Sequence, residues 1–163
     1  MRLLQHLFAP TASRTFPADS LRRIHDAIAE DERRHRGEIC FAVESALHWR
    51  EVWNGVTSRQ RAEAAFSQLH VWDTEANNGV LVYLLLADHR IEIIADRGLR
   101  DSVSDEQWRG ICQLMEERMK AGEAEEAVMR GVAEIGHLLA EHFPQRAGEA
   151  DQDELPNTPV ILR

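Results

Sequence analysis

The chain has little of several features that identify particular classes of protein. Its 163 residues include two cysteines, Cys40 and Cys112, and only 6% aromatic residues. Two cysteines set far apart in apolar segments give neither a disulfide framework nor a paired-cysteine zinc motif. No apolar run approaches the roughly 20 residues that a transmembrane helix needs. The sequence therefore predicts a domain that is held together by a hydrophobic core, without a transmembrane segment.

Basic residues are in the minority. Lys and Arg number 19 against 28 Asp and Glu, which gives a net charge of -9. A nucleic-acid-binding protein needs a basic face for phosphates, and the same charge opposes adsorption to anionic lipid. We therefore expect no nucleic-acid partner and no peripheral membrane association.

The N-terminal segment contains a short apolar stretch that Gln5 and His6 interrupt. It is too short for the apolar core of an export signal, so the sequence predicts a cytoplasmic protein. The simpler interpretation is an amphipathic turn that lies on a neighbouring helix or on a protein partner.

Alternating and helical periodicities predict seven elements. Segments 38–45, 79–87 and 91–95 have the composition of buried strands, and the first two are apolar on both faces. Helical patterns cover 17–34, a segment after the capping box at Thr57, one after the capping box at Ser104, and a last one that ends at Pro144. A helical crossover joins the first two strands in parallel, and a hairpin joins the second and third. The predicted fold is a three-layer α/β/α sandwich with a small mixed β-sheet.

The same patterns divide the chain into two regions. Residues 1–144 form the α/β domain, whereas residues 145–163 are acidic and poor in apolar side chains. Such a segment buries too little apolar surface to offset its ordering entropy, so we expect a disordered tail. Whether Val160 to Leu162 docks on the domain is left open by the sequence.

Polar residues gather at one predicted end of the sheet, where the first two strands begin and the third ends. The oxygen donors expected there are Asp73, Asn77, Asn78 and Asp96. Such ligands suit Ca²⁺ or Mg²⁺ better than zinc. Arg36 and Arg97 lie at the same end and are candidates for an anion site, since guanidinium groups bind phosphate or carboxylate through paired hydrogen bonds. The alternative is ordinary turn structure, in which Asn and Asp are common.

The segment from Trp72 to Asp88, followed by Glu92 to Gly98, resembles TPM-domain proteins, and the likeness extends from Glu32 to Phe143. The resemblance implies a small α/β/α sandwich, divalent-cation binding in some members, and acid phosphatase activity in a plant thylakoid branch. The common Asp-Asn-Gly triplet of the family appears here as Asn77-Asn78-Gly79. Asn78 and Gly79 carry over directly, and Asp96 carries over by approximate position. Many bacterial members have an export signal, a membrane span or a glycine-rich tail, and this sequence has none.

Two functions are compatible with these features. The first is a non-enzymatic accessory domain that binds a protein partner and takes up Ca²⁺ or Mg²⁺. It is favoured because the sequence has no nucleophile elbow, no phosphate-binding glycine loop and no paired histidines at metal-ligand spacing. The alternative is a metal-assisted phosphomonoesterase, in which a bound water attacks and an arginine neutralises the phosphate.

Overall fold

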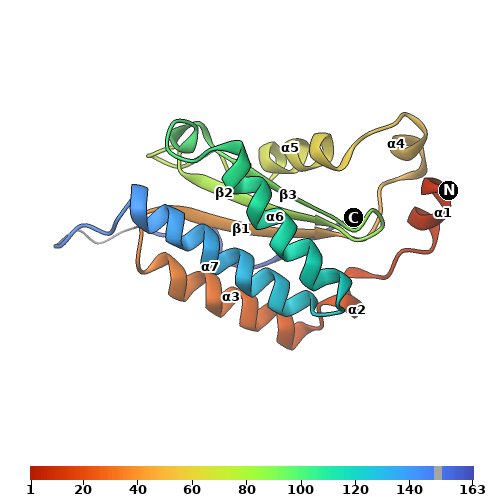
Figure 1. The fold of residues 1–163 in the computed structure, drawn as a ribbon, viewed down its shortest axis with the longest axis horizontal. Helices are drawn as coiled ribbons and strands as arrows, with labels where there is room; N and C mark the ends of the chain where they lie inside the picture. The colour runs from red at the N-terminus through yellow and green to blue at the C-terminus, as the bar shows by residue number, and fades with distance from the viewer. Residues whose placement is uncertain (149–151) are drawn as a thin grey trace.

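A computed structural model describes residues 1–148 and 152–163. The helices are α1 (Arg2–Leu7), α2 (Ala12–Thr15), α3 (Ala18–Glu32), α4 (Trp49–Trp53), α5 (Ser58–Gln68), the 3-10 helix η1 (Arg97–Leu99), α6 (Asp105–Lys120) and α7 (Ala124–His142). The strands are β1 (Glu38–Glu44), β2 (Gly79–Leu85), β3 (Arg90–Ala95) and β4 (Val160–Leu162). Figure 1 shows the long helices and the sheet lying side by side along one axis.

The strands form one mixed sheet in the order β3-β2-β1-β4. β1 and β2 are parallel, with Glu38 opposite Gly79, and β2 and β3 are antiparallel, with Val80 opposite Ala95. The predicted crossover and hairpin are therefore confirmed. The starts of β1 and β2 and the end of β3 lie at one end of the sheet, which we call the rim.

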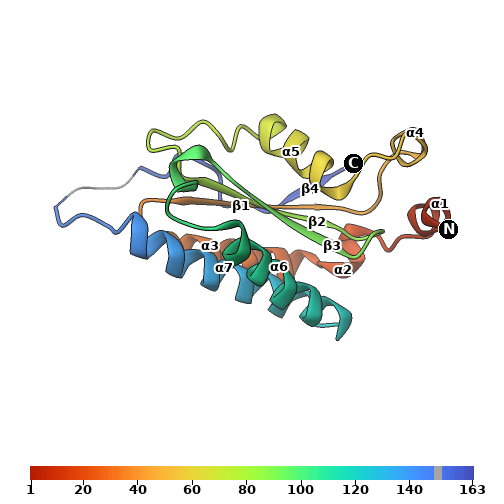
Figure 2. The same cartoon turned by 45° about the horizontal axis from the view of Figure 1, so that its top comes forward.

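Helices cover both faces of this sheet (Figure 2). Ile39, Phe41 and Val43 of β1 face α3, α6 and α7 in the larger core, whereas Cys40 and Ala42 face α5 in the smaller one. Every residue of β1 and β2 is buried, as the apolar character of both faces predicted. The three-layer α/β/α sandwich is confirmed.

One charged group lies inside the smaller core. Glu44 accepts hydrogen bonds from the Tyr83 hydroxyl and from the Arg61 guanidinium, whose Nε is 2.9 Å from the carboxylate. Glu44 and Tyr83 are both buried, so the hydrogen bonds from Tyr83 and Arg61 replace those that water would make to the carboxylate.

The C-terminal segment departs from the expectation of a disordered tail. Val160 to Leu162 pair in parallel with β1, and Leu155 and Leu162 join the core beneath α5. Two buried leucines and a strand pairing offset the entropy of ordering this acidic segment. Whether Val160 to Leu162 docks was left open by the sequence, and the structure pairs this segment with β1. Residues 149–151 of the predicted tail lie outside the described residues.

The structure adds four short helices that periodicity did not predict, namely α1, α2, α4 and η1. α1 and α4 contact each other at the end of the molecule opposite the rim (Figure 1). Among the helices of residues 1–148 and 152–163, none combines the length and the apolar character needed to cross a bilayer.

Candidate functional site

At the rim, the loop before β2 packs closely against the turn after β3. The Gly98 amide donates to the Asn77 carbonyl over 2.9 Å. A Cβ atom at Gly98 would lie 2.5 Å from the carbonyl oxygens of Ala76 and Asn77, a distance at which something must shift. Gly98 therefore allows a backbone approach that any other residue would obstruct.

Two of the predicted oxygen donors have a side-chain oxygen without a partner. The Nδ2 group of Asn78 donates to the Arg36 carbonyl over 2.7 Å, while Asn78 Oδ1 has no hydrogen-bond partner among the described residues. Asp96 Oδ1 accepts from the Arg97 amide over 2.7 Å and caps η1, while Asp96 Oδ2 is equally unpartnered within that part of the chain. Buried oxygens without partners are uncommon and need an explanation, such as an ion or a water.

The other predicted residues have different surroundings. Asn77 Oδ1 accepts from Arg97 Nε over 3.0 Å, so these two side chains bind each other. Arg36 Nε donates to the Pro144 carbonyl over 3.1 Å. Asp73 is exposed, and its backbone amide donates to the His70 carbonyl. The structure thus gathers Asn77, Asn78, Asp96 and Arg97 at the rim, whereas the guanidinium of Arg36 is directed to the end of α7.

A carboxylate cluster lies beside the start of β1, and sequence reasoning did not find it. Glu32, Glu38 and Asp153 each place one carboxylate oxygen within 4.8 Å of the others. They come from the end of α3, the start of β1 and the C-terminal segment. Glu38 is also a neighbour of Asn78, because its amide donates to the Asn78 carbonyl over 3.4 Å.

Backbone hydrogen bonds hold this cluster together. Glu32 Oε1 accepts from the Ile39 amide over 2.8 Å. The Glu38 carboxylate accepts from the amides of Glu154 and Leu155, over 3.1 and 3.4 Å. The Glu154 side chain in turn accepts from the amide of Glu75 in the rim loop, over 2.8 Å. The C-terminal segment therefore bridges the cluster and the rim.

The crowding of these carboxylates affects their protonation. Burial, followed by the charges of Glu38 and Asp153, raises the pKa of Glu32 to about 8, although the hydrogen bond from Ile39 opposes the shift. Three hard oxygen donors so close together could hold a Ca²⁺ or Mg²⁺ ion, whose charge would offset their mutual repulsion. The sequence predicted a cation at Asp73, Asn77, Asn78 and Asp96, whereas this cluster consists of other residues.

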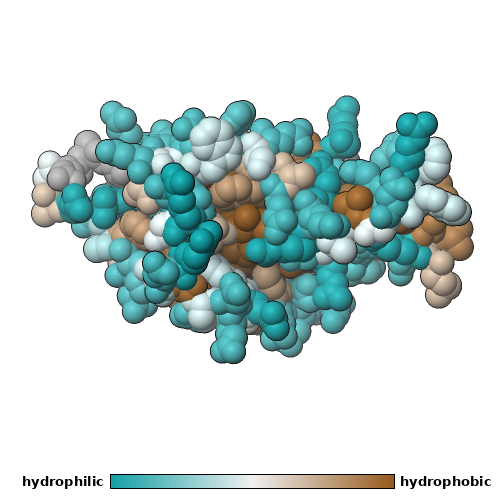
Figure 3. Space-filling model, turned by 90° about the horizontal axis from the view of Figure 1, so that it is seen from above, coloured by the Kyte–Doolittle hydropathy of each residue, from teal (hydrophilic) through white to brown (hydrophobic). Residues whose placement is uncertain are grey.

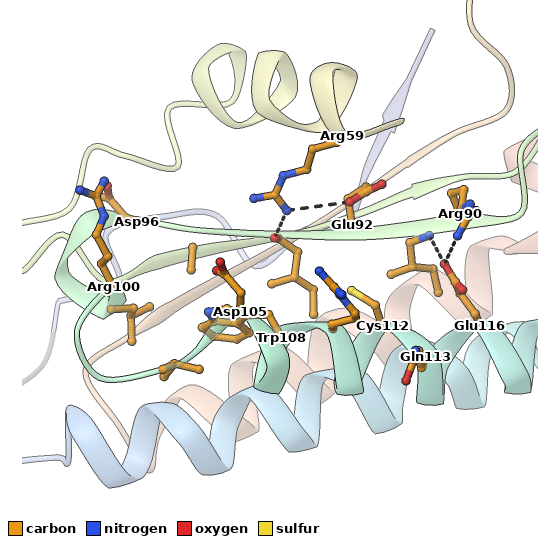
Figure 4. A pocket seen from close by; sticks show the side chains of 16 residues that line it. Arg59, Arg90, Glu92, Asp96, Arg100, Asp105, Trp108, Cys112, Gln113 and Glu116 are labelled. Atoms are coloured by element: carbon orange, nitrogen blue, oxygen red, sulfur yellow. Dashed lines mark hydrogen bonds and ion pairs between the residues drawn. The ribbon is translucent and has the colours of Figure 1, made fainter. Parts of the chain in front are cut away.

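A groove of about 700 Å³ runs along the free edge of β3, between α5 and α6 (Figure 4). Side chains occupy the outward backbone groups of the strand: Arg59 donates to the Ile93 carbonyl over 2.8 Å, and the Ile91 amide donates to Glu116 over 3.3 Å. Cys112 lies in the same groove, in hydrogen-bond contact with the Ile93 backbone.

Neither cysteine has the character of a nucleophile. Burial raises the pKa of Cys112 to about 12 and that of Cys40 to about 11. Both thiols therefore stay protonated near neutral pH, in agreement with the interpretation of the two cysteines as packing residues.

Comparisons with known proteins identify the family to which this fold belongs. The model of the TPM domain matches residues 12–138. The NMR structure of the BA42 protein from the psychrophilic bacterium Bizionia argentinensis is similar, with a TM-score of 0.78, 30% identity, and coverage of 90% of this chain and 94% of that chain. The solution structure of the N-terminal domain of a P. gingivalis protein shares the fold, with a TM-score of 0.61, 18% identity, and coverage of 80% and 83% of the two chains. Comparison with curated proteins gives no match. The chain belongs to the TPM-domain family.

Proposed function

We propose that the chain is a non-enzymatic accessory domain that binds a divalent cation, Ca²⁺ or Mg²⁺, between Glu32, Glu38 and Asp153. The observation that carries the proposal is the convergence of these three carboxylates, with their oxygens within 4.8 Å of one another. The buried Oδ1 of Asn78, which has no hydrogen-bond partner among the described residues, marks a second position at which an ion could sit, at the rim. A cation would offset both the burial of the Glu32 carboxylate and its repulsion by Glu38 and Asp153, which together raise the pKa of Glu32.

Such an ion would link parts of the chain that are far apart in sequence. Asp153 precedes Leu155 and β4, whereas Glu32 and Glu38 flank the entry into β1. Cation binding would therefore stabilise the docked C-terminal segment against the sheet, in the way that ligand binding stabilises any state that presents the complete site. We further propose that a protein partner recognises the rim in this ordered state.

Two arginine contacts support an accessory role over the metal-assisted phosphomonoesterase. Arg36 binds the Pro144 carbonyl and Arg97 binds the Asn77 amide oxygen, so both candidates for holding phosphate are engaged by protein oxygens. We expect no hydrolysis of a generic phosphomonoester with Ca²⁺, Mg²⁺ or Mn²⁺. Turnover that chelator abolishes and that Asp153→Asn removes would establish the phosphatase instead.

Calorimetric titration with Ca²⁺ and Mg²⁺ tests the site. Asp153 is exposed, so Asp153→Asn removes a ligand charge with little effect on the core, and we expect at least a roughly tenfold weaker affinity. Asp73→Asn is the matched control, because it removes a carboxylate of similar exposure near the rim but outside the cluster. We expect this control to bind like the wild type.

The titration also separates the two possible positions of the ion. Loss of binding in Asp96→Asn, with Asp153→Asn unaffected, would place the ion beside the unpartnered oxygens of Asn78 and Asp96 and would refute the cluster. Absence of uptake by the wild type at millimolar concentrations would refute cation binding altogether.

A further inference from the structure

The outer edge of β3 presents the backbone groups of every second residue to the groove between α5 and α6. The Asp96 amide donates to the Gly79 carbonyl of β2, so the amide and the carbonyl of Ala95 point the other way, into the groove. Ile91 and Ile93 point outward for the same reason, since the backbone of a strand alternates with a period of two.

Side chains of the protein bind the outward groups of Ile91 and Ile93 but not those of Ala95. The Ile91 amide donates to Glu116, and the Ile93 carbonyl accepts from Arg59 Nη1 over 2.8 Å. The amide and the carbonyl of Ala95 have no hydrogen-bond partner among residues 1–148 and 152–163. An open pair of backbone groups at a sheet edge can bind one residue of an added chain.

Two donors lie next to each other at this position. Along an outward edge the carbonyl of one residue is followed by the amide of the next, so the Ala95 amide lies beside the Ile93 carbonyl that Arg59 binds. Arg59 Nε donates to Glu63, and Nη1 lies 3.9 Å from Glu92, whereas Nη2 has no partner within the described chain. A guanidinium and a backbone amide that converge in this way suit a carboxylate.

The order of these groups determines which end of a chain fits. A residue that pairs with Ala95 in the antiparallel sense donates its amide to the Ala95 carbonyl and accepts from the Ala95 amide. Beyond it the chain would run toward Ile93, where the Arg59 guanidinium stands in the way. The chain therefore has to end opposite Ala95, with its terminal carboxylate at Arg59. A parallel chain would bring its terminal ammonium to the same guanidinium, which repels it.

The last side chain of such a chain meets an apolar wall. Opposed residues of antiparallel strands place their side chains on the same face of the sheet, and Ala95 packs against the larger core on the α6 face. The wall of the groove includes Leu99, Val103 and the half-buried Trp108 (Figure 4). Figure 3 shows apolar residues exposed between hydrophilic side chains near the middle of the molecule. These contacts favour an apolar last residue.

The charge of the groove does not oppose an anion, although the chain as a whole has a net charge of -9. Glu92 accepts from the Ser58 hydroxyl, and Arg100 and Arg109 have no ion-pair partner in the part of the chain that the structure describes. The lining has equal numbers of arginines and carboxylates, namely Arg59, Arg90, Arg100 and Arg109 against Glu92, Asp96, Asp105 and Glu116. The volume of about 700 Å³ is typical of ligand sites.

We infer that this groove binds the C-terminal end of a polypeptide whose last side chain is apolar. The terminal carboxylate accepts from the Ala95 amide and from Arg59, the last amide donates to the Ala95 carbonyl, and the last side chain packs on Trp108. The inference does not rest on cation binding, because no residue of the carboxylate cluster lines the groove.

NMR titration of the isotope-labelled full chain, with chelator present, tests this inference. The probe is a hexapeptide that ends in leucine with a free carboxylate, and the control probe is the same peptide with an amidated C-terminus. At millimolar concentration the free peptide should shift the Ala95 amide and the Trp108 indole signals, while the indole of Trp72, which lies before β2, stays unchanged. Amidation should weaken binding by roughly tenfold, because it removes the charge that Arg59 binds.

Arg59→Gln should weaken binding of the free peptide by roughly tenfold and leave the amidated peptide unaffected. Arg130→Gln is the matched control, because Arg130 is similarly exposed and pairs with Glu126 on its own helix, as Arg59 does with Glu63. The spectra also show whether each variant is folded.

Replacing the last leucine of the peptide by serine should also weaken binding, since less apolar surface is buried on Trp108. Equal affinity for the free and amidated peptides would refute the inference, as would an Ala95 amide that does not respond to the free peptide at millimolar concentration. Equal shifts from Ile91 to Ile93 with both peptides would overturn it in favour of strand addition along the whole edge.

Discussion

The amide of Ile39 donates a hydrogen bond of 2.8 Å to Glu32 Oε1, so the last residue of α3 covers part of the β1 edge. β4 pairs only with Ala42, Val43 and Glu44 on that edge. The start of β1 is instead covered by a carboxylate that is itself crowded by Glu38 and Asp153. The hydrogen bond that covers this edge therefore depends on the protonation state of Glu32 and on the charges of Glu38 and Asp153.

We expect the stability of the cation-free protein to fall as pH rises from about 5 to 9. Folding raises the pKa of Glu32 from an ordinary value near 4.5 to about 8. The folded state thus binds this proton more tightly, and the resulting stabilisation is complete below the unfolded pKa and disappears as pH passes the folded one. Glu32→Gln keeps an acceptor for Ile39, so it should flatten this dependence in urea titrations with chelator. Glu30→Gln on the same helix is exposed and should leave the pH profile unchanged.

The buried Glu44 should make Arg61 important for stability. Arg61→Met removes a cation 2.9 Å from a buried carboxylate, and breaking a buried pair costs about 3–5 kcal/mol in the free energy of unfolding. Tyr83→Phe removes one neutral donor and should cost about 1–3 kcal/mol. Arg130→Met breaks an exposed pair with Glu126 and should cost less than about 1 kcal/mol. Chemical denaturation measures the loss of unfolding free energy in each variant. Equal losses in the three variants would contradict the expected order.

The C-terminal strand should contribute to folding through its buried leucine. Leu162→Ala removes a side chain that packs in the smaller core, and we expect a loss of about 2–3 kcal/mol in unfolding free energy. Ile161→Ala alters the adjacent residue, which is exposed, and should cost less than about 1 kcal/mol. If both variants melt like the wild type, β4 does not stabilise the domain in solution.

Two glycines should respond in opposite ways to alanine. A Cβ atom at Gly79 would lie 2.1 Å from the Val71 carbonyl oxygen, so Gly79→Ala should displace the rim loop and lower the melting temperature by many degrees. Gly110 lies within α6 and has no atom within 4 Å of the same position. Gly110→Ala should therefore stabilise the protein by about 0.5–1 kcal/mol, since glycine is unfavourable inside a helix. Thermal unfolding of the two variants tests the contrast.

Most of the fold could be predicted because its long elements carry strong local patterns. The capping boxes at Thr57 and Ser104 mark the starts of α5 and α6, as the structure bears out. β4 gives no such pattern, because its three residues are too few to show a periodicity. They form a strand only because they pair with β1, which is distant in sequence. For α1 the sequence predicted an amphipathic turn against a neighbouring helix, and α1 does contact α4, but its inward-facing residues are His6 and Arg2 rather than its leucines.

The candidate site could be predicted only in part. The topology placed Asn78 and Asp96 at one end of the sheet, because a parallel crossover and a hairpin determine that arrangement. The cluster with Asp153 could not be derived, since it depends on how the C-terminal segment returns to the sheet. The hydrogen bond between Asn77 and Arg97 could not be predicted either, because it joins side chains of two loops whose conformations the sequence pattern does not determine.

The groove beside β3 bears on whether strands of other molecules can add to the sheet. An edge strand normally offers its amides and carbonyls as a template on which further strands can assemble. Here Arg59, Cys112 and Glu116 occupy backbone groups of Ile91 and Ile93, so a strand from another molecule would have to displace them first. The opposite edge ends in β4, whose three residues are too few to seed an extended ladder. Addition of further strands to the native sheet is therefore obstructed at both edges. At the β3 edge side chains bind the backbone groups, and at the other edge β4 is too short.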